Sequence, residues 1–197
     1  MQPIFLIGPP ASGKTTLGRA LARATGREFI DLDLYIEQRF HATVAQLFAT
    51  LGEDGFRTLE HNMLHEVAEI YDLIIACGGG TPCFFDNMEY MNSRGLTVRL
   101  TATEERLADR LQRAGARRPM FAQLTREEIM ANSRRLSEER EPFYSQAAMT
   151  FCGDELEDRR QIDRSVKRFL SLVPSLTDKE PSPAHQPEIH TQSPHKP

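Results

Sequence analysis

Short apolar runs alternate along this chain with longer segments in which apolar residues recur every three or four positions. The apolar runs are typical of buried strands, and they cover residues 3–7, 28–32, 73–77, 96–100 and 149–151. Segments between them, such as 16–24, have the period of amphipathic helices. Strands that alternate with helices predict an α/β fold, in which a parallel sheet carries helices on both faces and binds ligands at the carboxyl ends of its strands.

The longest of these helices is predicted over residues 53–70. Its core-facing stripe consists of Phe56, Leu59, Met63, Val67 and Ile70. Arg57 and Glu60 border this stripe as i, i+3 neighbours, so Glu60 can hold the guanidinium while Arg57 presents it to a ligand carboxylate. The alternative is an exposed ion pair, which contributes less than about 1 kcal/mol to stability.

The first predicted strand leads directly into Gly-Pro-Pro-Ala-Ser-Gly-Lys-Thr, residues 8–15, and then into a helix. This is a Walker A sequence in the strand-to-helix context that the motif requires, and we call residues 8–15 the phosphate loop. Its backbone N–H groups and the helix N-terminus can wrap phosphates, Lys14 can reach the β and γ oxygens as a catalytic residue, and the Thr15 hydroxyl can hold Mg²⁺. The predicted ATP-binding residues are Gly8, Ala11, Ser12, Gly13, Lys14, Thr15 and Thr16.

Two aspartates mark the end of the second predicted strand. Asp31 and Asp33 are two residues apart, a spacing that on a strand points both carboxylates the same way. Two like charges at this distance are unfavourable unless a cation or a substrate hydroxyl lies between them. We therefore expect Asp31 to help hold Mg²⁺ and Asp33 to accept a substrate hydroxyl as a catalytic residue. The alternative is that Asp33 caps a helix over residues 35–40.

The third predicted strand ends in Gly78, Gly79 and Gly80, which we call the triple glycine. Nucleotide hydrolases commonly carry an acidic residue at this place to help hold Mg²⁺, so that task falls to Asp31 here. Glycines expose backbone N–H groups and let a ligand approach the main chain closely. We expect an anionic or polar substrate at this turn, the alternative being a simple flexible connection.

Composition indicates one folded domain of ordinary size. Of 197 residues, 40% are hydrophobic and 26% are charged, and the net charge of −4 includes no basic stripe for nucleic acid. The apolar runs are shorter than the ~18 residues of a membrane span, and the N-terminus has no signal-peptide pattern. We expect a cytoplasmic enzyme whose Cys77, Cys83 and Cys152 are reduced thiols.

The composition changes after about Leu172. Residues 173–197 are rich in Pro, Ser, His and Gln and have few apolar residues to bury, which predicts a disordered tail. The alternative is that its His185, His190 and His195 bind a metal.

Taken together, these motifs resemble the shikimate kinase family over residues 3–172. The resemblance rests on the order and spacing of the phosphate loop, Asp31-x-Asp33 followed by Ile36-Glu37, Gly55-Phe56-Arg57-x-x-Glu60, the triple glycine, Arg118-Pro119 and Arg140-x-Pro142-x-Tyr144. It implies an enzyme that transfers the γ-phosphoryl group of ATP to the 3-hydroxyl of shikimate, in the route to chorismate and the aromatic amino acids. It also implies a three-layer α/β/α fold of the P-loop kinase type, with a five-stranded parallel sheet, a mobile lid and one domain over residues 1–172. We expect a monomer.

The resemblance further implies roles for individual residues. Arg57 and Arg140 would clamp the carboxylate of shikimate, and the other shikimate-binding residues would be Asp33, Gly78, Gly79 and Gly80. Arg118 would be a catalytic and ATP-binding residue in the lid, residues 112–124, and Arg110 would lie against adenine. The family usually has glycine where this chain has Ala11. If that position requires positive φ, alanine costs about 1 kcal/mol.

Two other functions stay open at this point. A different small-molecule kinase, such as a gluconate kinase or a relative of adenylate kinase, would keep the phosphate loop. A nucleotide-dependent switch would need an Asn-Lys-x-Asp run or an acidic residue after the third strand, and the sequence has neither.

Overall fold

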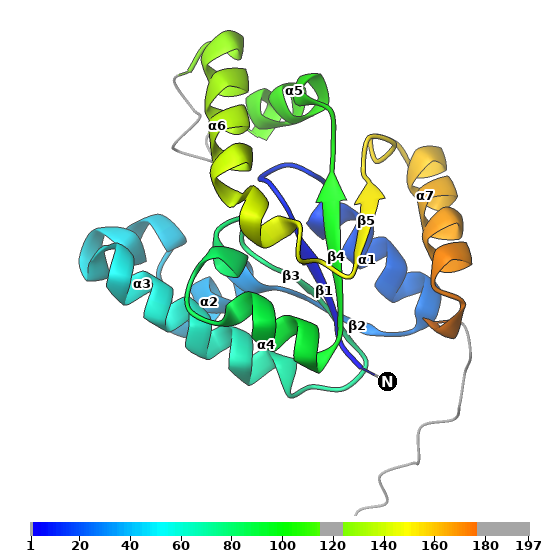
Figure 1. Cartoon of the computed structure of the whole chain (residues 1–197), viewed down its shortest axis with the longest axis horizontal. Helices are drawn as coiled ribbons and strands as arrows, with labels where there is room; N and C mark the ends of the chain where they lie inside the picture. Colours follow the sequence, from blue (N-terminus) through cyan, green and yellow to red (C-terminus); the bar gives the residue numbers. More distant parts are fainter. Residues whose placement is uncertain (1, 115–123, 177–197) are drawn as a thin grey trace, which may run out of the picture.

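The computed structural model describes residues 2–114 and 124–176. Its centre is a five-stranded parallel sheet with the strand order β2-β3-β1-β4-β5. The strands are β1 (Ile4–Ile7), β2 (Glu28–Asp31), β3 (Leu73–Ala76), β4 (Leu96–Thr101) and β5 (Met149–Cys152). The predicted parallel α/β sheet is confirmed, and each predicted strand is found within two residues of its expected bounds (Figure 1).

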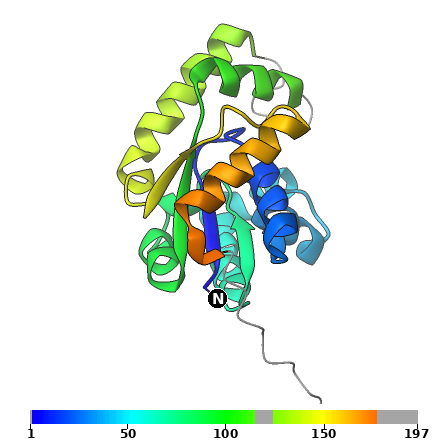
Figure 2. The ribbon, with the colours of Figure 1, turned by 90° about the vertical axis from the view of Figure 1, so that its right-hand side faces the viewer.

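Helices cover both faces of this sheet. They are α1 (Lys14–Thr25), α2 (Leu32–Phe40), α3 (Val44–Ala68), α4 (Asn87–Arg94), α5 (Glu104–Ala114), α6 (Arg126–Tyr144) and α7 (Arg159–Leu172), with short 3₁₀ turns η1 (Thr81–Cys83) and η4 (Pro174–Leu176). Alternate residues of β1 point to opposite faces, so Phe5 and Ile7 pack with α2, α3 and α4, whereas Ile4 and Leu6 pack with α1 and α7. In Figure 2, α7 lies in front of the strands, and α5 and α6 lie above their carboxyl ends.

The helices α5 and α6 form a small separate core above the sheet. Its buried members are Ala108, Leu111 and Ile129, and Ala11 of the phosphate loop packs against them. This contact places the pair of helices over the loop. Most of the predicted lid between them, residues 115–123, lies outside the described residues.

The predicted helix over residues 53–70 is longer at its start and shorter at its end. Thr43 caps α3 through a reciprocal capping box with Gln46, which moves the start of the helix to Val44. At Gly52 the backbone leaves helical geometry, with φ 69° and ψ −179°, so α3 consists of two helical pieces joined at a kink. The second piece carries four residues of the predicted core stripe and both members of the Arg57–Glu60 pair, whereas Ile70, the fifth predicted core residue, lies beyond the helix and is exposed, so that part of the prediction is wrong.

Residues 173–176, the first four of the predicted tail, continue the fold just beyond the approximate boundary expected at residue 172. Leu176 at the end of η4 is buried in the same core as α1 and α7. The backbone N–H of Val173 also donates to the Phe169 carbonyl and closes α7. Leu176 lies four residues beyond the end of α7, and the composition of this segment alone does not indicate that its side chain is buried.

Within the described ranges, every helix is too short or too polar to cross a membrane.

Candidate active site

The two glycines of the phosphate loop are required by close packing and by backbone conformation. Gly8 has φ 130°, and a Cβ atom there would lie 2.3 Å from the carbonyl oxygen of Leu100. Gly13 has φ 105°, and a Cβ atom there would lie 2.4 Å from a methyl carbon of Leu156. Neither position accepts another residue without moving the loop. Helix α1 begins at Lys14, so its free N–H groups face the loop as a phosphate site requires.

Lys14 folds back over this loop. Its Nζ donates to the carbonyl oxygens of Gly8 and Pro9, each at 2.8 Å. The ammonium group is therefore held at the position where the loop would enclose phosphates.

Ala11 has φ 65°, so the strained conformation anticipated for alanine at this position is present. Two contacts help to hold it there. The Ala11 methyl packs against the α5–α6 core, and Arg110 Nη1 donates to the Ala11 carbonyl oxygen at 3.2 Å. Glycine has no side chain that could pack in this way. The packing of the Ala11 methyl thus offsets part of the energetic cost of its positive φ.

Arg110 joins the phosphate loop to the turn after β5. Its Nε donates to Glu157 at 2.7 Å and its Nη2 to the Gly153 carbonyl at 2.8 Å. Burial of Glu157 opposes its ionisation, but the hydrogen bonds from Arg110 and Arg113 prevail and lower the pKa of this carboxyl. These contacts assign Arg110 a structural role. Contact with adenine stays a prediction, and Arg118 lies outside the described residues.

The two aspartates after β2 occupy different elements, so their expected side-by-side placement on a strand is wrong. Asp31 ends β2 and caps α2, because its carboxylate accepts from the Leu34 N–H at 3.4 Å. Its other oxygen accepts from the Thr15 hydroxyl at 2.7 Å. Asp33 lies in the first turn of α2 and not at its cap, which overturns the alternative interpretation of Asp33 as a helix cap.

The triple glycine makes room for charged side chains. A Cβ atom on Gly78 would lie 2.9 Å from Asp33 Oδ1, one on Gly79 would lie 2.9 Å from Arg140 Nη1, and one on Gly80 would lie 2.7 Å from Arg57 Nη2. All three glycines lack positive φ. Their need for glycine is therefore steric: the turn brings Asp33, Arg57 and Arg140 to one place against the main chain.

Arg57 is not the exposed ion pair that was the alternative interpretation. Its guanidinium is 11% exposed and Glu60 is 2% exposed, and Arg57 Nη1 donates to Glu60 Oε2 at 2.8 Å. The same guanidinium lies 4.1 Å above the ring centroid of Phe84. Thr81 donates its hydroxyl to Glu60 Oε1 at 2.6 Å, so the carboxylate that holds Arg57 is itself held.

Tyr144 is a site residue whose role could not be predicted from the sequence. Its hydroxyl donates to the Gly79 carbonyl at 2.6 Å, and its side chain is fully buried. Burial is the main cause that raises the pKa of Tyr144 to about 12, against the opposing effect of Arg140. The tyrosine therefore stays a neutral donor that fixes the turn beneath Arg140.

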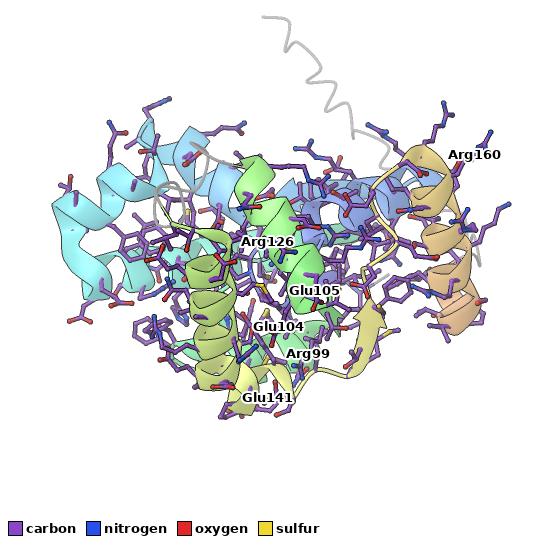
Figure 3. The ribbon with its side chains drawn as sticks, turned by 90° about the horizontal axis from the view of Figure 1, so that it is seen from above. Arg99, Glu104, Glu105, Arg126, Glu141 and Arg160 are labelled. Atoms are coloured by element: carbon purple, nitrogen blue, oxygen red, sulfur yellow. The ribbon has the colours of Figure 1, made fainter. Side chains whose placement is uncertain are left out.

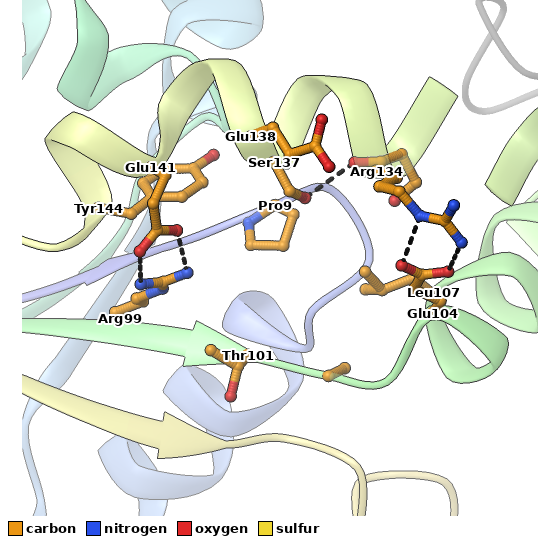
Figure 4. A pocket seen from close by; sticks show the side chains of 12 residues that line it. Pro9, Arg99, Thr101, Glu104, Leu107, Arg134, Ser137, Glu138, Glu141 and Tyr144 are labelled. Carbon is orange, nitrogen blue, oxygen red and sulfur yellow. Dashed lines mark hydrogen bonds and ion pairs between the residues drawn. The ribbon is translucent and has the colours of Figure 1, made fainter. Parts of the chain in front are cut away.

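Two bidentate ion pairs hold α6 over the end of the sheet. Arg99 of β4 donates to Glu141 at 2.7 and 2.5 Å, and Arg134 donates to Glu104 of α5 at 2.8 and 2.6 Å (Figure 3 and Figure 4). Between them lies a cavity of about 540 Å³ that borders the phosphate loop at Pro9. The predicted substrate-binding residues do not line this cavity. The ion pairs fix the helix that carries Arg140 and Tyr144.

Comparisons with known proteins agree with this arrangement. The family model described as shikimate kinase matches residues 10–171. A shikimate kinase from Phocaeicola vulgatus is 55% identical over 166 residues, which cover 84% of this chain and 95% of that protein.

Solved structures agree as well. The crystal structure of shikimate kinase from Bacteroides thetaiotaomicron has a TM-score of 0.85 at 51% identity and covers 88% of this chain and 98% of its own. The shikimate kinase from Acinetobacter baumannii in complex with shikimate has a TM-score of 0.74 at 35% identity, with 91% and 96% covered. With a family model that spans most of the domain and relatives above half identity, this chain belongs to the shikimate kinase family.

Proposed function

We propose that this chain transfers the γ-phosphoryl group of ATP to the 3-hydroxyl of shikimate, giving shikimate 3-phosphate and ADP in the route to chorismate and the aromatic amino acids. One observation carries the proposal: Asp33, Arg57 and Arg140 converge on the triple glycine, next to a phosphate loop. Two guanidinium groups match a carboxylate, and one carboxylate matches a hydroxyl. The relative from Acinetobacter baumannii forms a complex with shikimate, which supports the same acceptor here.

On the nucleotide side, the N–H groups at the start of α1 and the Lys14 ammonium bind and orient the phosphates. Glycine at positions 8 and 13 lets the loop pack closely against Leu100 and Leu156, which holds its backbone in place. We include the predicted ATP-binding residues Ala11, Ser12, Thr15 and Thr16 in this site, with Arg110 and Arg118 as the arginines that complete it.

Thr15 and Asp31 fit a Mg²⁺ ion. Their side-chain oxygens lie 2.7 Å apart at the edge of the phosphate loop, and hard oxygen ligands are those that Mg²⁺ prefers. When bound, Mg²⁺ neutralises negative charge on the phosphates.

On the acceptor side, Arg57 and Arg140 hold the shikimate carboxylate and so fix the ring. Asp33 accepts the hydrogen bond of the 3-hydroxyl and takes its proton as the new O–P bond forms. The bond between the γ-phosphorus and the β–γ bridging oxygen breaks, and ADP leaves. Lys14 and Arg118 stabilise the charge that develops on the transferred group. Positioning and electrostatics supply the catalysis, as this reaction requires.

Release of ADP by the purified protein with Mg²⁺ and ATP tests the proposal. Parallel reactions contain no acceptor, shikimate, gluconate or AMP, and Lys14→Ala serves as the inactive control. We expect strong stimulation by shikimate alone. Stimulation by gluconate or AMP alone would overturn the acceptor assignment but keep the nucleotide site, and slow release that ignores all acceptors would favour a nucleotide switch.

Two further statements belong to this proposal. All three cysteines are free, which supports a reducing compartment such as the cytoplasm. We also propose that the protein is a monomer, and light scattering of the purified protein tests this.

A further inference from the structure

A cluster of metal-ligand side chains lies outside the site described above. His61 and His65 are i, i+4 neighbours on α3, and Asp86 stands at the start of α4. One potential ligand atom from each of the three lies within 4.8 Å of the other two. The two imidazole rings have centroids 4.2 Å apart. No established step of the kinase reaction uses these residues.

His65 presents a nitrogen that the fold leaves without a partner. Its ring stacks on Tyr90, with centroids 3.6 Å apart and planes 16° apart, so the ring orientation is fixed. Its Nε2 is buried and has no hydrogen-bond partner among the described residues. A buried polar atom in this state costs about 1–3 kcal/mol. A neutral histidine ring offers a metal ion the lone pair of one of its two ring nitrogens.

The tautomer of His61 follows from its neighbours. Asn87 Nδ2 donates to the Thr81 carbonyl at 2.8 Å, so its Oδ1 is the atom that faces His61 Nδ1 at 2.7 Å. An amide oxygen only accepts, and His61 Nδ1 therefore carries the hydrogen. The lone pair of neutral His61 lies on Nε2. Histidine ligands of metal ions commonly donate their other ring N–H in this way, which orients the ligand.

Asp86 occupies a helix-capping position but does not cap. It is the N-cap residue of α4, yet its side chain accepts no hydrogen bond from the first turn. Its Oδ1 instead lies 3.8 Å from His61 Nδ1. The preceding Phe85 has φ 51°, a conformation that a bulky residue rarely adopts. The turn thus carries backbone strain while directing Asp86 to the histidines and not to its own helix.

We infer that His61, His65 and Asp86 form a binding site for Zn²⁺. Two imidazole nitrogens and one carboxylate oxygen are a common zinc ligand set, with water as the fourth ligand. Ligand atoms in a tetrahedral site with bonds of about 2.1 Å lie about 3.4 Å apart. Asp86 Oδ1 lies 3.8 Å from the hydrogen-bearing Nδ1 of His61, so zinc binding requires the Asp86 side chain, which is 65% exposed, to rotate toward His61 Nε2. The nitrogen ligands distinguish this site from the all-oxygen pair proposed for Mg²⁺.

Calorimetric titration of the EDTA-treated full-length chain with ZnCl₂ tests this inference. The variants are His65→Gln, Asp86→Asn, and a tail variant in which His185, His190 and His195 are all replaced by glutamine. We expect one zinc ion per chain in the wild type and in the tail variant, and affinity at least tenfold weaker in His65→Gln and in Asp86→Asn. Unchanged affinity in both site variants, or loss of the stoichiometric site in the tail variant alone, would overturn the inference.

Thermal unfolding provides a second measurement, because weak binding of zinc at the surface would not change the melting temperature. With free zinc at one hundred times its dissociation constant, the melting temperature should rise by about 5–10 °C in the wild type and the tail variant. It should rise little in His65→Gln. Far-UV circular dichroism of the metal-free proteins checks that each variant folds. If His65→Gln fails to fold, the test rests on Asp86→Asn, because that substitution changes an exposed side chain. An equal rise in wild type and Asp86→Asn would contradict the assignment.

Discussion

Replacing Arg57 by lysine is the sharpest test of the carboxylate clamp. Lysine keeps a positive charge beside the buried Glu60 but cannot form the two parallel hydrogen bonds that a guanidinium makes to a carboxylate. Loss of one charge-assisted hydrogen bond costs about 1.5–3 kcal/mol, which corresponds to a rise of roughly 10–150-fold in the KM for shikimate. The KM for ATP should stay within about twofold, because Lys14 donates to carbonyl groups of the phosphate loop whereas Arg57 donates to Glu60.

Lysine is preferred to alanine for this test because Arg57→Ala would leave Glu60 buried without a cation, at a cost of about 3–5 kcal/mol in stability. A coupled assay of ADP release, with each substrate varied in turn, gives both KM values. The matched control is Arg135→Lys, which alters an i, i+4 pair with Glu139 that is 60% and 54% exposed and should change neither constant. An unchanged KM for shikimate, or an equal rise in the KM for ATP, would refute the division of roles.

Three further predictions concern the phosphate loop, the buried tyrosine and the end of the chain. Lys14→Ala should abolish ADP release with every acceptor, and residual shikimate-dependent turnover near the wild-type rate would contradict its role. For Tyr144, the folded pKa is about 12 and the unfolded value about 10, so the stability it contributes is present below pH 10 and is lost as the pH rises towards 12, by up to about 3 kcal/mol. The free energy of unfolding in urea should therefore fall less steeply between pH 10 and pH 12 for Tyr144→Phe than for the wild type. Equal slopes in the two proteins would disprove this. Leu176→Ala should lower the free energy of unfolding by about 2–3 kcal/mol, whereas deletion of residues 177–197 should leave both stability and turnover unchanged.

Local chemistry made part of this molecule predictable. The phosphate loop could be recognised because its glycines and lysine obey constraints within eight residues, and the structure accounts for Gly8 by its close approach to the Leu100 carbonyl and for both Gly8 and Gly13 by their positive φ. The strands could be placed because apolar runs buried on both faces differ from amphipathic helices. Positive φ at Ala11 was one of two conformations that the sequence left open, and the packing that supports it comes from α5 and α6, far along the chain.

Other features depend on contacts that no short segment contains. The family resemblance implied that Arg57, Arg140 and the triple glycine share one site, but the sequence did not show that the guanidinium groups lie where Cβ atoms of other residues would be. Tyr144 and Gly79 are 65 residues apart, so their hydrogen bond has no local signal. Asp31 and Asp33 were assigned to a strand because the apolar run continues through Leu32, whereas Asp31 caps a helix that starts at that residue.

That early start of α2 explains how the two halves of the site are placed relative to each other. Asp31 bonds to Thr15 at the phosphate loop, and Asp33, half a turn of helix further on, faces Gly78. The loop and the turn also lie close to each other, because a Cβ atom on Gly79 would lie 3.2 Å from Pro10 Cδ. Gly79 is thus constrained from both sides, by Pro10 and by Arg140. In a reaction that depends on positioning, the sheet itself fixes this distance, because the phosphate loop and the acceptor turn follow the paired parallel strands β1 and β3.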